Sequence, residues 1–189
     1  MRAPIGDFDN AVPAPDCLDL LTEPVAAAVR AWQGSVPADQ LLYVDTDPEI
    51  ADTAVFVEHH DQDLLDRSAN CVIVAGKRGE ETTLAACLVR SATRVDVNGV
   101  VRRHLGARKA RFADMAIATG ESGMEYGGIT PIGLPADWPL LVDASVVDTD
   151  WVLVGSGRRR GKLILPGKAF AELPGAVVLE GLGVDVAAG

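Results

Sequence analysis

The feature that most restricts how this chain can fold is the segment GMEYGGITPIGLP, residues 123–135. Four of its thirteen residues are glycines and two are prolines. Glycine loses more conformational freedom on ordering than any other residue, so the segment is costly to hold in one conformation. We therefore expect a loop that the rest of the chain has to order.

Two interpretations of this loop are open. Gly127 and Gly128 can adopt positive φ, which lets successive N–H groups point into one concavity that suits a carbonyl oxygen, a carboxylate or a phosphate. Pro131 and Pro135 limit the freedom of the unfolded chain and stiffen the loop. In the alternative interpretation, the loop is a tight connection that packs under a sheet and binds nothing.

Apolar runs and capping signals predict short helices and strands on both sides of the loop. The apolar runs 70–76 and 83–90, separated by KRGEET, predict an antiparallel hairpin. Asp47-Pro48 predicts the start of a helix that runs to about residue 59, and Asn98 is a plausible N-cap for a helix over 99–105. Further strands are expected at 41–45, 108–112, 139–144, 151–157, 162–166 and 176–180, and further helices at 24–32, 113–122 and 167–173. Mixed hairpin and crossover connections indicate an α/β (α+β mixed) domain around one sheet.

Length and composition indicate one domain with a substantial core. A chain of 189 residues with 48% hydrophobic residues fits a single domain at residues 16–189. Residues 1–15 carry three prolines and no periodicity, so we expect a flexible N-terminal extension. Three cysteines without a CxxC pair do not make a disulfide framework, and no apolar run approaches the ~18 residues of a membrane span. These observations predict a reduced, cytoplasmic protein.

Charge is distributed unevenly along the chain. The formal net charge is −10, but residues 77–111 hold nine basic and three acidic residues, and Arg158, Arg159, Arg160 and Lys162 form a second basic cluster. Such clusters either bind a phosphate-bearing partner or are solvated surfaces. The sequence pI of about 4.7 disfavours a tight, non-specific nucleic-acid binder.

The order of the motifs resembles a known family. Six segments follow one another over roughly residues 45–182: a strand at NCVIVAG, its return strand, HLGARK, the loop GMEYGGITPIG, LLVDAS and VGSGRRRGKLILP. In this order they resemble the YbaK/EbsC and prolyl-tRNA-synthetase-associated family of trans-editing aminoacyl-tRNA deacylases.

The resemblance implies a single domain with a curved, partly open mixed sheet flanked by helices. It also implies hydrolysis of the ester that joins a wrong, small amino acid to tRNA, typically tRNA(Pro). The family's GxxxP loop, which lines the aminoacyl pocket, falls here on residues 127–131. Preorganised amides suit this reaction because negative charge develops on the ester's carbonyl oxygen. The implied partners are an aminoacylated tRNA and an aminoacyl-tRNA synthetase, with no membrane, no DNA, no metal and no organic cofactor.

One position departs from the family pattern. Family members carry a lysine, which helps to position the substrate, where this chain has Asn70. Lys77 lies near the other end of the same strand, about 20 Å away at ~3.3 Å per residue. Three explanations follow: Asn70 and the substrate's own 2′-hydroxyl suffice, a basic residue such as Arg158 reaches the pocket, or the pocket binds without hydrolysing. The last defines the alternative function, a non-catalytic module that recognises an aminoacyl-adenosine or another nucleotide end.

These considerations assign expected roles to particular residues. The expected catalytic residues are Asn70, Gly127 and Gly128. The expected substrate contacts are Ile129, Thr130, Pro131, Gly133, Asp143, Ser156 and Arg158. The expected tRNA phosphate contacts are Arg102, Arg103, Arg159 and Arg160. Asp143 has a second interpretation as the cap of the following turn.

Other reactive side chains have simpler interpretations. His59 and His60 adjoin Asp61 and Asp63, but neighbouring histidines at a helix end point apart, so no metal site is expected. Cys71 and Cys87 lie on the two strands of the predicted hairpin, and no His–Asp arrangement accompanies them. We interpret both cysteines as core residues.

Overall fold

The computed structural model describes residues 1–50, 56 and 63–186. Its helical elements are η1 (Ala14–Leu20), α1 (Glu23–Arg30), η2 (Ala38–Gln40), η3 (Pro48–Ile50), α3 (Leu64–Arg67), η4 (Val97–Val101), α4 (Arg102–His104), α5 (Met115–Ser122), α6 (Ala144–Val147) and η5 (Gly167–Glu172). Its strands are β1 (Val12–Pro13), β2 (Leu42–Val44), β3 (Ala69–Arg78), β4 (Glu81–Arg90), β5 (Thr93–Val95), β6 (Lys109–Phe112), β7 (Leu140–Asp143), β8 (Val152–Gly155), β9 (Lys162–Leu165), β10 (Ala176–Leu179) and β11 (Gly183–Asp185). Within this part of the chain, no helix combines the length and the apolar character needed to cross a membrane.

The largest sheet has the strand order β10-β7-β4-β3-β6. The predicted hairpin is its centre: β3 and β4 pair antiparallel from Ala69–Arg90 to Arg78–Glu81, and Gly79 (φ 64°) supplies the left-handed turn residue. β6 adds to β3 in the antiparallel sense, whereas β7 adds to β4 and β10 to β7 in the parallel sense. The sheet is therefore mixed, as expected.

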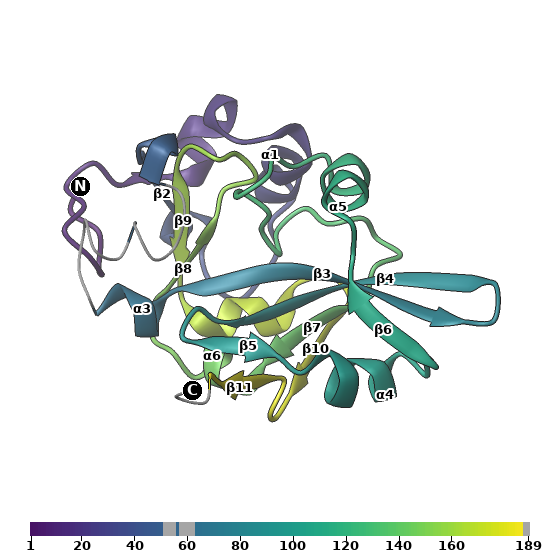
Figure 1. Ribbon diagram of the computed structural model, residues 1–189. Coiled ribbons are helices and arrows are strands. Elements are labelled where there is room, and N and C mark those ends of the chain that lie inside the picture. Colours follow the sequence, from purple (N-terminus) through teal and green to yellow (C-terminus); the bar gives the residue numbers. More distant parts are fainter. Residues whose placement is uncertain (51–55, 57–62, 187–189) are drawn as a thin grey trace.

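Each face of this sheet is covered by different elements (Figure 1). On one face, Ile73 and Leu88 pack in the main core with residues of α1 and α5, such as Val25 and Ala118. On the other face, residues of β3, β4 and β7 pack against η4, β5 and Leu182. Alternate residues of β3 thus belong to different cores, which is why its sequence is a continuous apolar run.

A second sheet with the order β1-β2-β9-β8 stands beside the first (Figure 1). An isolated parallel bridge between Ser68 and Leu153 joins the two sheets where β3 begins. The sequence indicated one sheet because every strand has similar local signals, and only long-range pairing divides them. Both of these sheets are open, a third sheet pairs β11 with β5 in the antiparallel sense, and the expected mixed α/β fold is confirmed.

The N-terminal residues pack against the second sheet. Side chains of this segment share a buried cluster with β2, β8, β9 and Phe56; they are Ala3, Ile5, Phe8 and Ala11. The N-terminal ammonium donates to the carbonyl of Ala11 at 2.7 Å. Apolar residues spaced irregularly over a proline-containing segment produce this packing without any periodic signal. The limits 1–15 and 16–189 stay a prediction.

Two predicted helix starts differ in detail. The N-cap before η4 is Asp96, whose carboxylate accepts from the amides of Gly99 and Val100 at 2.9 and 3.0 Å, so Asn98 is not the cap. After Asp47, residues Pro48–Ile50 form a 3-10 turn, and most of the predicted helix to residue 59 lies outside the described residues. The helix expected at 167–173 is the 3-10 element η5.

Candidate active site

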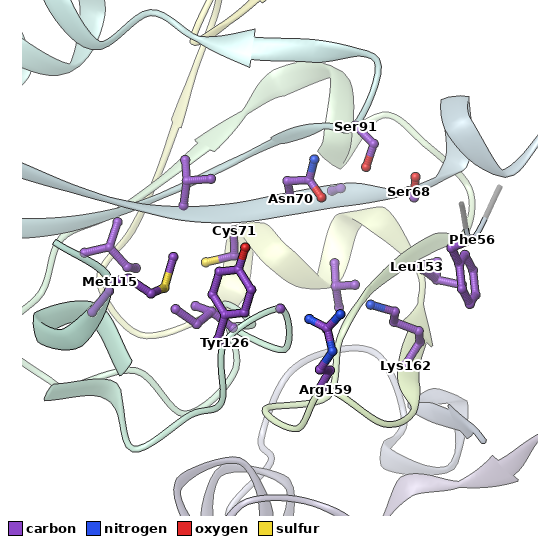
Figure 2. A pocket seen from close by; sticks show the side chains of 18 of the residues that line it. Phe56, Ser68, Asn70, Cys71, Ser91, Met115, Tyr126, Leu153, Arg159 and Lys162 are labelled. Atoms are coloured by element: carbon purple, nitrogen blue, oxygen red, sulfur yellow. The ribbon is translucent and has the colours of Figure 1, made fainter. Parts of the chain in front are cut away.

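A hollow of the described chain, here called the main pocket, has a volume of about 670 Å³. It lies where the first residues of β3 meet α5, the beginning of the Gly/Pro loop and the β8–β9 hairpin (Figure 2). This end of β3 is open to the pocket because β6 pairs only with residues 74–77 of β3. The pocket therefore forms at the point where the sheet lacks its edge strand.

Only the first part of the Gly/Pro loop reaches the main pocket. Tyr126, Gly127 and Ile129 line it. Farther along, Ile132 and Thr130 are fully buried, and a Cβ on Gly133 would lie 2.4 Å from the carbonyl oxygen of Pro24. Both interpretations of the loop hold, each for a different part: Tyr126, Gly127 and Ile129 line a cavity, whereas Gly128 and residues 130–133 pack against the rest of the protein.

The backbone of the loop is tied to the β8–β9 hairpin. The amide of Glu125 donates to the carbonyl of Gly157, and the amide of Gly157 donates to the carbonyl of Gly128, both at 2.8 Å. Gly128 also donates its own amide to the carbonyl of Glu125 at 3.0 Å. The N–H of Gly128 is thus used inside the turn, because the loop closes on itself before it meets the hairpin.

Two other loop amides are better placed to bind a ligand. Among the described residues, the N–H groups of Gly127 and Ile129 donate to no recorded acceptor, and both residues line the main pocket. Gly127 has φ 78°, which gives this turn the left-handed conformation that the sequence predicts. An amide pair at this position can bind an oxygen that carries negative charge.

The side chains of β3 alternate between the two faces of the sheet, and this decides what enters the pocket. Figure 2 shows Cys71 on the side of β3 that faces Tyr126, whereas Asn70 and Ser91 lie on the opposite side of the ribbon. Asn70 still lines the rim of the cavity. Burial raises the pKa of the Cys71 thiol well above its ordinary value, so Cys71 is a neutral wall residue. Burial likewise raises the pKa of Cys87 to about 12.

Two cations of the second basic cluster line the main pocket: Arg159 and Lys162 (Figure 2). The guanidinium of Arg159 lies 5.8 Å from the centre of the Tyr126 ring, and its Nε donates to the carbonyl of Pro48 at 3.0 Å. Lys162 is only 7% exposed, and its Nζ lies 5.6 Å from the centre of the Phe56 ring. Lys162 thus brings a buried ammonium group to the wall of the cavity.

Sequence reasoning did not identify Lys162 as a pocket residue. The available signal was a lysine that opens the apolar strand KLIL, where it would alternate with residues of a buried face. Its position depends on β9 pairing with both β2 and β8, which no local pattern reveals.

Several expected substrate contacts have structural partners instead. Arg158 is directed to the carbonyls of Asp19 and Leu21, at 3.2 and 3.1 Å from its Nη2. The hydroxyl of Ser156 donates within the hairpin turn, to the carbonyl of Arg160 at 3.0 Å. These residues shape the hairpin that carries Arg159 and Lys162, and they do not line the main pocket.

Asp143 also has structural partners. Its carboxylate accepts from the amide of Ser145 at 2.9 Å and from the amide of Gly183 at 2.7 Å. It caps α6 and holds the chain that leads into β11, which matches the second of its two interpretations. Pro131 is buried with the core half of the loop.

The four expected phosphate contacts are dispersed. Arg159 lines the main pocket, and Arg102 lines a second hollow. Arg103 is exposed on α4 and lines neither. Arg160 binds Asp45 through two hydrogen bonds of 2.6 Å, and this contact lowers the pKa of the Asp45 carboxyl.

Among the residues that the structure describes, no cluster of His, Cys, Asp and Glu could hold a metal ion, and His59 and His60 lie outside that part of the chain.

Solved structures share this fold. A computationally designed scaffold for presenting grafted epitopes has a TM-score of 0.68 and 19% identity, over 84% of this chain and 95% of that one. A candidate trans-editing enzyme for prolyl-tRNA synthetase has a TM-score of 0.66 and 19% identity, over 83% of this chain and 93% of that one. A hypothetical protein has a TM-score of 0.63 and 20% identity, over 76% of this chain and 91% of that one.

The sequence itself matches a family model, the aminoacyl-tRNA editing domain, at residues 47–173. This match covers about two thirds of the 189 residues and includes β3, the Gly/Pro loop and the β8–β9 hairpin. The predicted resemblance is therefore confirmed, and the chain belongs to the family of aminoacyl-tRNA editing domains.

Proposed function

We propose that this protein is a cytoplasmic trans-editing deacylase that hydrolyses the ester of a mischarged tRNA, with a small amino acid on tRNA(Pro) as the substrate. The observation that carries the proposal is the main pocket, where Gly127 and Ile129, whose N–H groups have no recorded acceptor among the described residues, line one cavity with Arg159 and Lys162. These are the groups that the charge on a developing oxyanion requires.

In the proposed reaction, water attacks the carbonyl carbon of the aminoacyl ester. A C–O bond to water forms, the ester C–O bond breaks, and the products are the free amino acid and the 3′-terminal hydroxyl of the tRNA. The Gly127 and Ile129 amides stabilise the negative charge on the carbonyl oxygen. No carboxylate or imidazole is among the described residues that line the pocket, so we assign orientation of the water to the substrate's own vicinal hydroxyl.

Lys162 takes the part that the family's lysine plays elsewhere. Because Asn70 lies on the face of β3 opposite Cys71, its amide is poorly directed toward the loop. Lys162 brings a full charge from β9, and Figure 2 shows its side chain and that of Arg159 directed into the space below β3. We propose that Lys162 holds the carbonyl side of the substrate and that Arg159 holds the phosphate or ribose of the terminal adenosine.

The walls of the pocket suit a small side chain. Apolar residues from β3, α5 and the loop line it: Cys71, Ile73, Met115, Ala118 and Ile129. One methylene changes discrimination by only about 1–3 kcal/mol, so small amino acids escape synthetase selection and need a second site that removes errors. An aminoacyl-tRNA synthetase is the proposed second partner.

One observation favours a second candidate function, a binding module that holds an aminoacyl-adenosine end without hydrolysing it. Asn70 stands at the position of the family's lysine and lies on the other side of β3 from Tyr126. In this case the pocket keeps its shape and its charges but lacks the group that activates the ester for hydrolysis.

The deciding experiment measures deacylation of alanyl-, cysteinyl- and seryl-tRNA(Pro) by the natural protein, Asn70→Lys and Lys162→Met. We expect turnover by the natural protein and much slower turnover by Lys162→Met. Turnover only by Asn70→Lys would establish the binding module. The deacylase proposal is wrong if the natural protein and Asn70→Lys turn over none of the three substrates, yet both of these proteins bind an aminoacyl-adenosine analogue.

A further inference from the structure

A second hollow, here called the basic hollow, has a volume of about 620 Å³ beside the outer end of β3 and β6. Five of its nine lining residues are cationic, and none is acidic; the cations are Lys77, Arg102, Arg108, Lys109 and Arg111. The remaining four are small or neutral polar residues, namely Ala75, Thr82, Asn98 and Ala110. A hollow of this composition is unusual on a chain with a net charge of −10.

Most of these cations remain available to a ligand. Lys77, Lys109 and Arg111 are exposed. Among the described residues, the five cations make one ion pair, between Arg111 and Asp114 at 3.9 Å, with side chains that are 74% and 64% exposed. Such a pair contributes little. Arg102 donates its Nε to the carbonyl of Asn98 at 2.8 Å and keeps its other guanidinium N–H groups. The local positive potential is therefore only weakly neutralised by the protein.

The basic hollow continues the main pocket along the same strands. On β3, Ile73 lines the main pocket and Ala75 lines the basic hollow. On β6, Phe112 lines the main pocket and its neighbour Arg111 lines the basic hollow. Ala75 pairs with Arg111 and Lys77 with Lys109, so Lys77 on β3 lies beside Lys109 on the edge strand β6. From Cys71 to Lys77, β3 extends about 20 Å at ~3.3 Å per residue.

We propose that the basic hollow binds backbone phosphates of the acceptor strand of the same tRNA whose aminoacylated end occupies the main pocket. This rests on the proposed function. Polynucleotide phosphates follow one another every few ångströms, so the stretch of about 20 Å along β3 accommodates several of them. The cations give the strand a direction, because its 3′ end meets the open end of β3. An acidic protein can then bind one polyanion in one orientation.

The test separates binding at the basic hollow from chemistry in the main pocket. The variant Lys77→Gln/Lys109→Gln/Arg111→Gln is compared with Arg30→Gln/Arg94→Gln/Lys168→Gln, which removes the same charge from positions that line neither hollow. Binding of uncharged tRNA(Pro) is measured at several salt concentrations. The affinity falls with salt, and each lost phosphate contact makes the negative slope of log K against log salt shallower by about 0.7 for a single strand. We therefore expect the slope to become shallower by about 2 in the first variant only.

A short aminoacylated CCA oligonucleotide serves as the second probe, because it reaches the main pocket but not the basic hollow. We expect the first variant to hydrolyse it as the natural protein does while its KM for full-length aminoacyl-tRNA rises at least tenfold. If both triple variants bind tRNA with the same affinity and slope, the proposal is overturned, whether or not any protein hydrolyses an ester. Should the triple variant not fold, Lys109→Gln alone is used, with an expected slope decrease of about 0.7.

Discussion

At the scale of single residues, Lys162 is the side chain whose replacement separates the proposed functions most sharply. Lys162→Met keeps the volume and removes the charge, so we expect kcat/KM for the mischarged tRNA to fall about 10- to 100-fold, the equivalent of ~1.5–3 kcal/mol for a hydrogen bond to a charged group. Urea unfolding of the same variant gives its stability, so that kcat/KM is compared at temperatures where both proteins are folded. Lys162→Arg, which keeps the charge, should retain part of the activity. Unchanged kcat/KM in Lys162→Met would contradict the proposal that Lys162 holds the carbonyl side of the substrate.

Tyr43 provides a prediction about pH at the same scale. Burial, followed by the charge of Asp45, raises the pKa of Tyr43 from 10.0 to about 12. Because the folded value is the higher one, the phenol contributes stability that is complete below pH 10 and is lost as the pH rises toward about 12. Urea unfolding between these values should show stability falling more steeply in the natural protein than in Tyr43→Phe. If the unfolding free energies of the two proteins fall in parallel as the pH rises, other groups determine the loss of stability at alkaline pH.

At the scale of elements, the Gly/Pro loop and the β8–β9 hairpin are packed backbone to backbone. A Cβ at Gly128 would lie 2.3 Å from the carbonyl carbon and oxygen of Arg158, which cannot move without opening the hairpin. We expect Gly128→Ala to lose at least about 2 kcal/mol of unfolding free energy, the scale of overpacked sites.

Gly127→Ala should behave differently. Its Cβ would meet Nη1 of Arg159 at 2.7 Å, the end of a side chain that can swing aside, although φ 78° adds a strain of about 1–2 kcal/mol. Displacing Arg159 disturbs the main pocket directly. We therefore expect Gly127→Ala to lose more activity per unit of lost stability than Gly128→Ala. Urea unfolding and deacylation assays on both variants measure this difference. If the two variants lose the same activity per unit of lost stability, Arg159 has no role in the pocket.

The elements also show how far local sequence signals reach. The β3–β4 hairpin, α1, α5 and the Gly123 cap could be predicted, because their signals lie within about ten residues of one another. The positions of Asn70 and Cys71 relative to the pocket could not, because a shift of one residue moves a side chain to the other face. Lys162 joins the pocket through Phe56 and β2, more than a hundred residues earlier in the chain. Pocket composition depends on such long-range pairing, which local patterns do not encode.

At the scale of the whole molecule, the N-terminal residues and the main pocket share one buried cluster. Phe8 stacks on Phe56 with ring centres 5.9 Å apart and an interplanar angle of 22°. Phe56 in turn lies under the ammonium group of Lys162. A chain of contacts thus leads from the first ten residues to the charge at the wall of the pocket, and we expect the N-terminal segment to support the site.

Phe8→Ala tests this support. Phe8 is 4% exposed, so its truncation should lower the unfolding free energy by about 3 kcal/mol or more. Leu20→Ala, at a residue that is 39% exposed, is the matched control and should lose much less. Because the cavity left by Phe8 frees Phe56, we also expect Phe8→Ala to lower kcat at temperatures where the variant is fully folded, with binding of uncharged tRNA unchanged. Full kcat in a destabilised Phe8→Ala protein would mean that the N-terminal segment stabilises the fold without positioning Lys162.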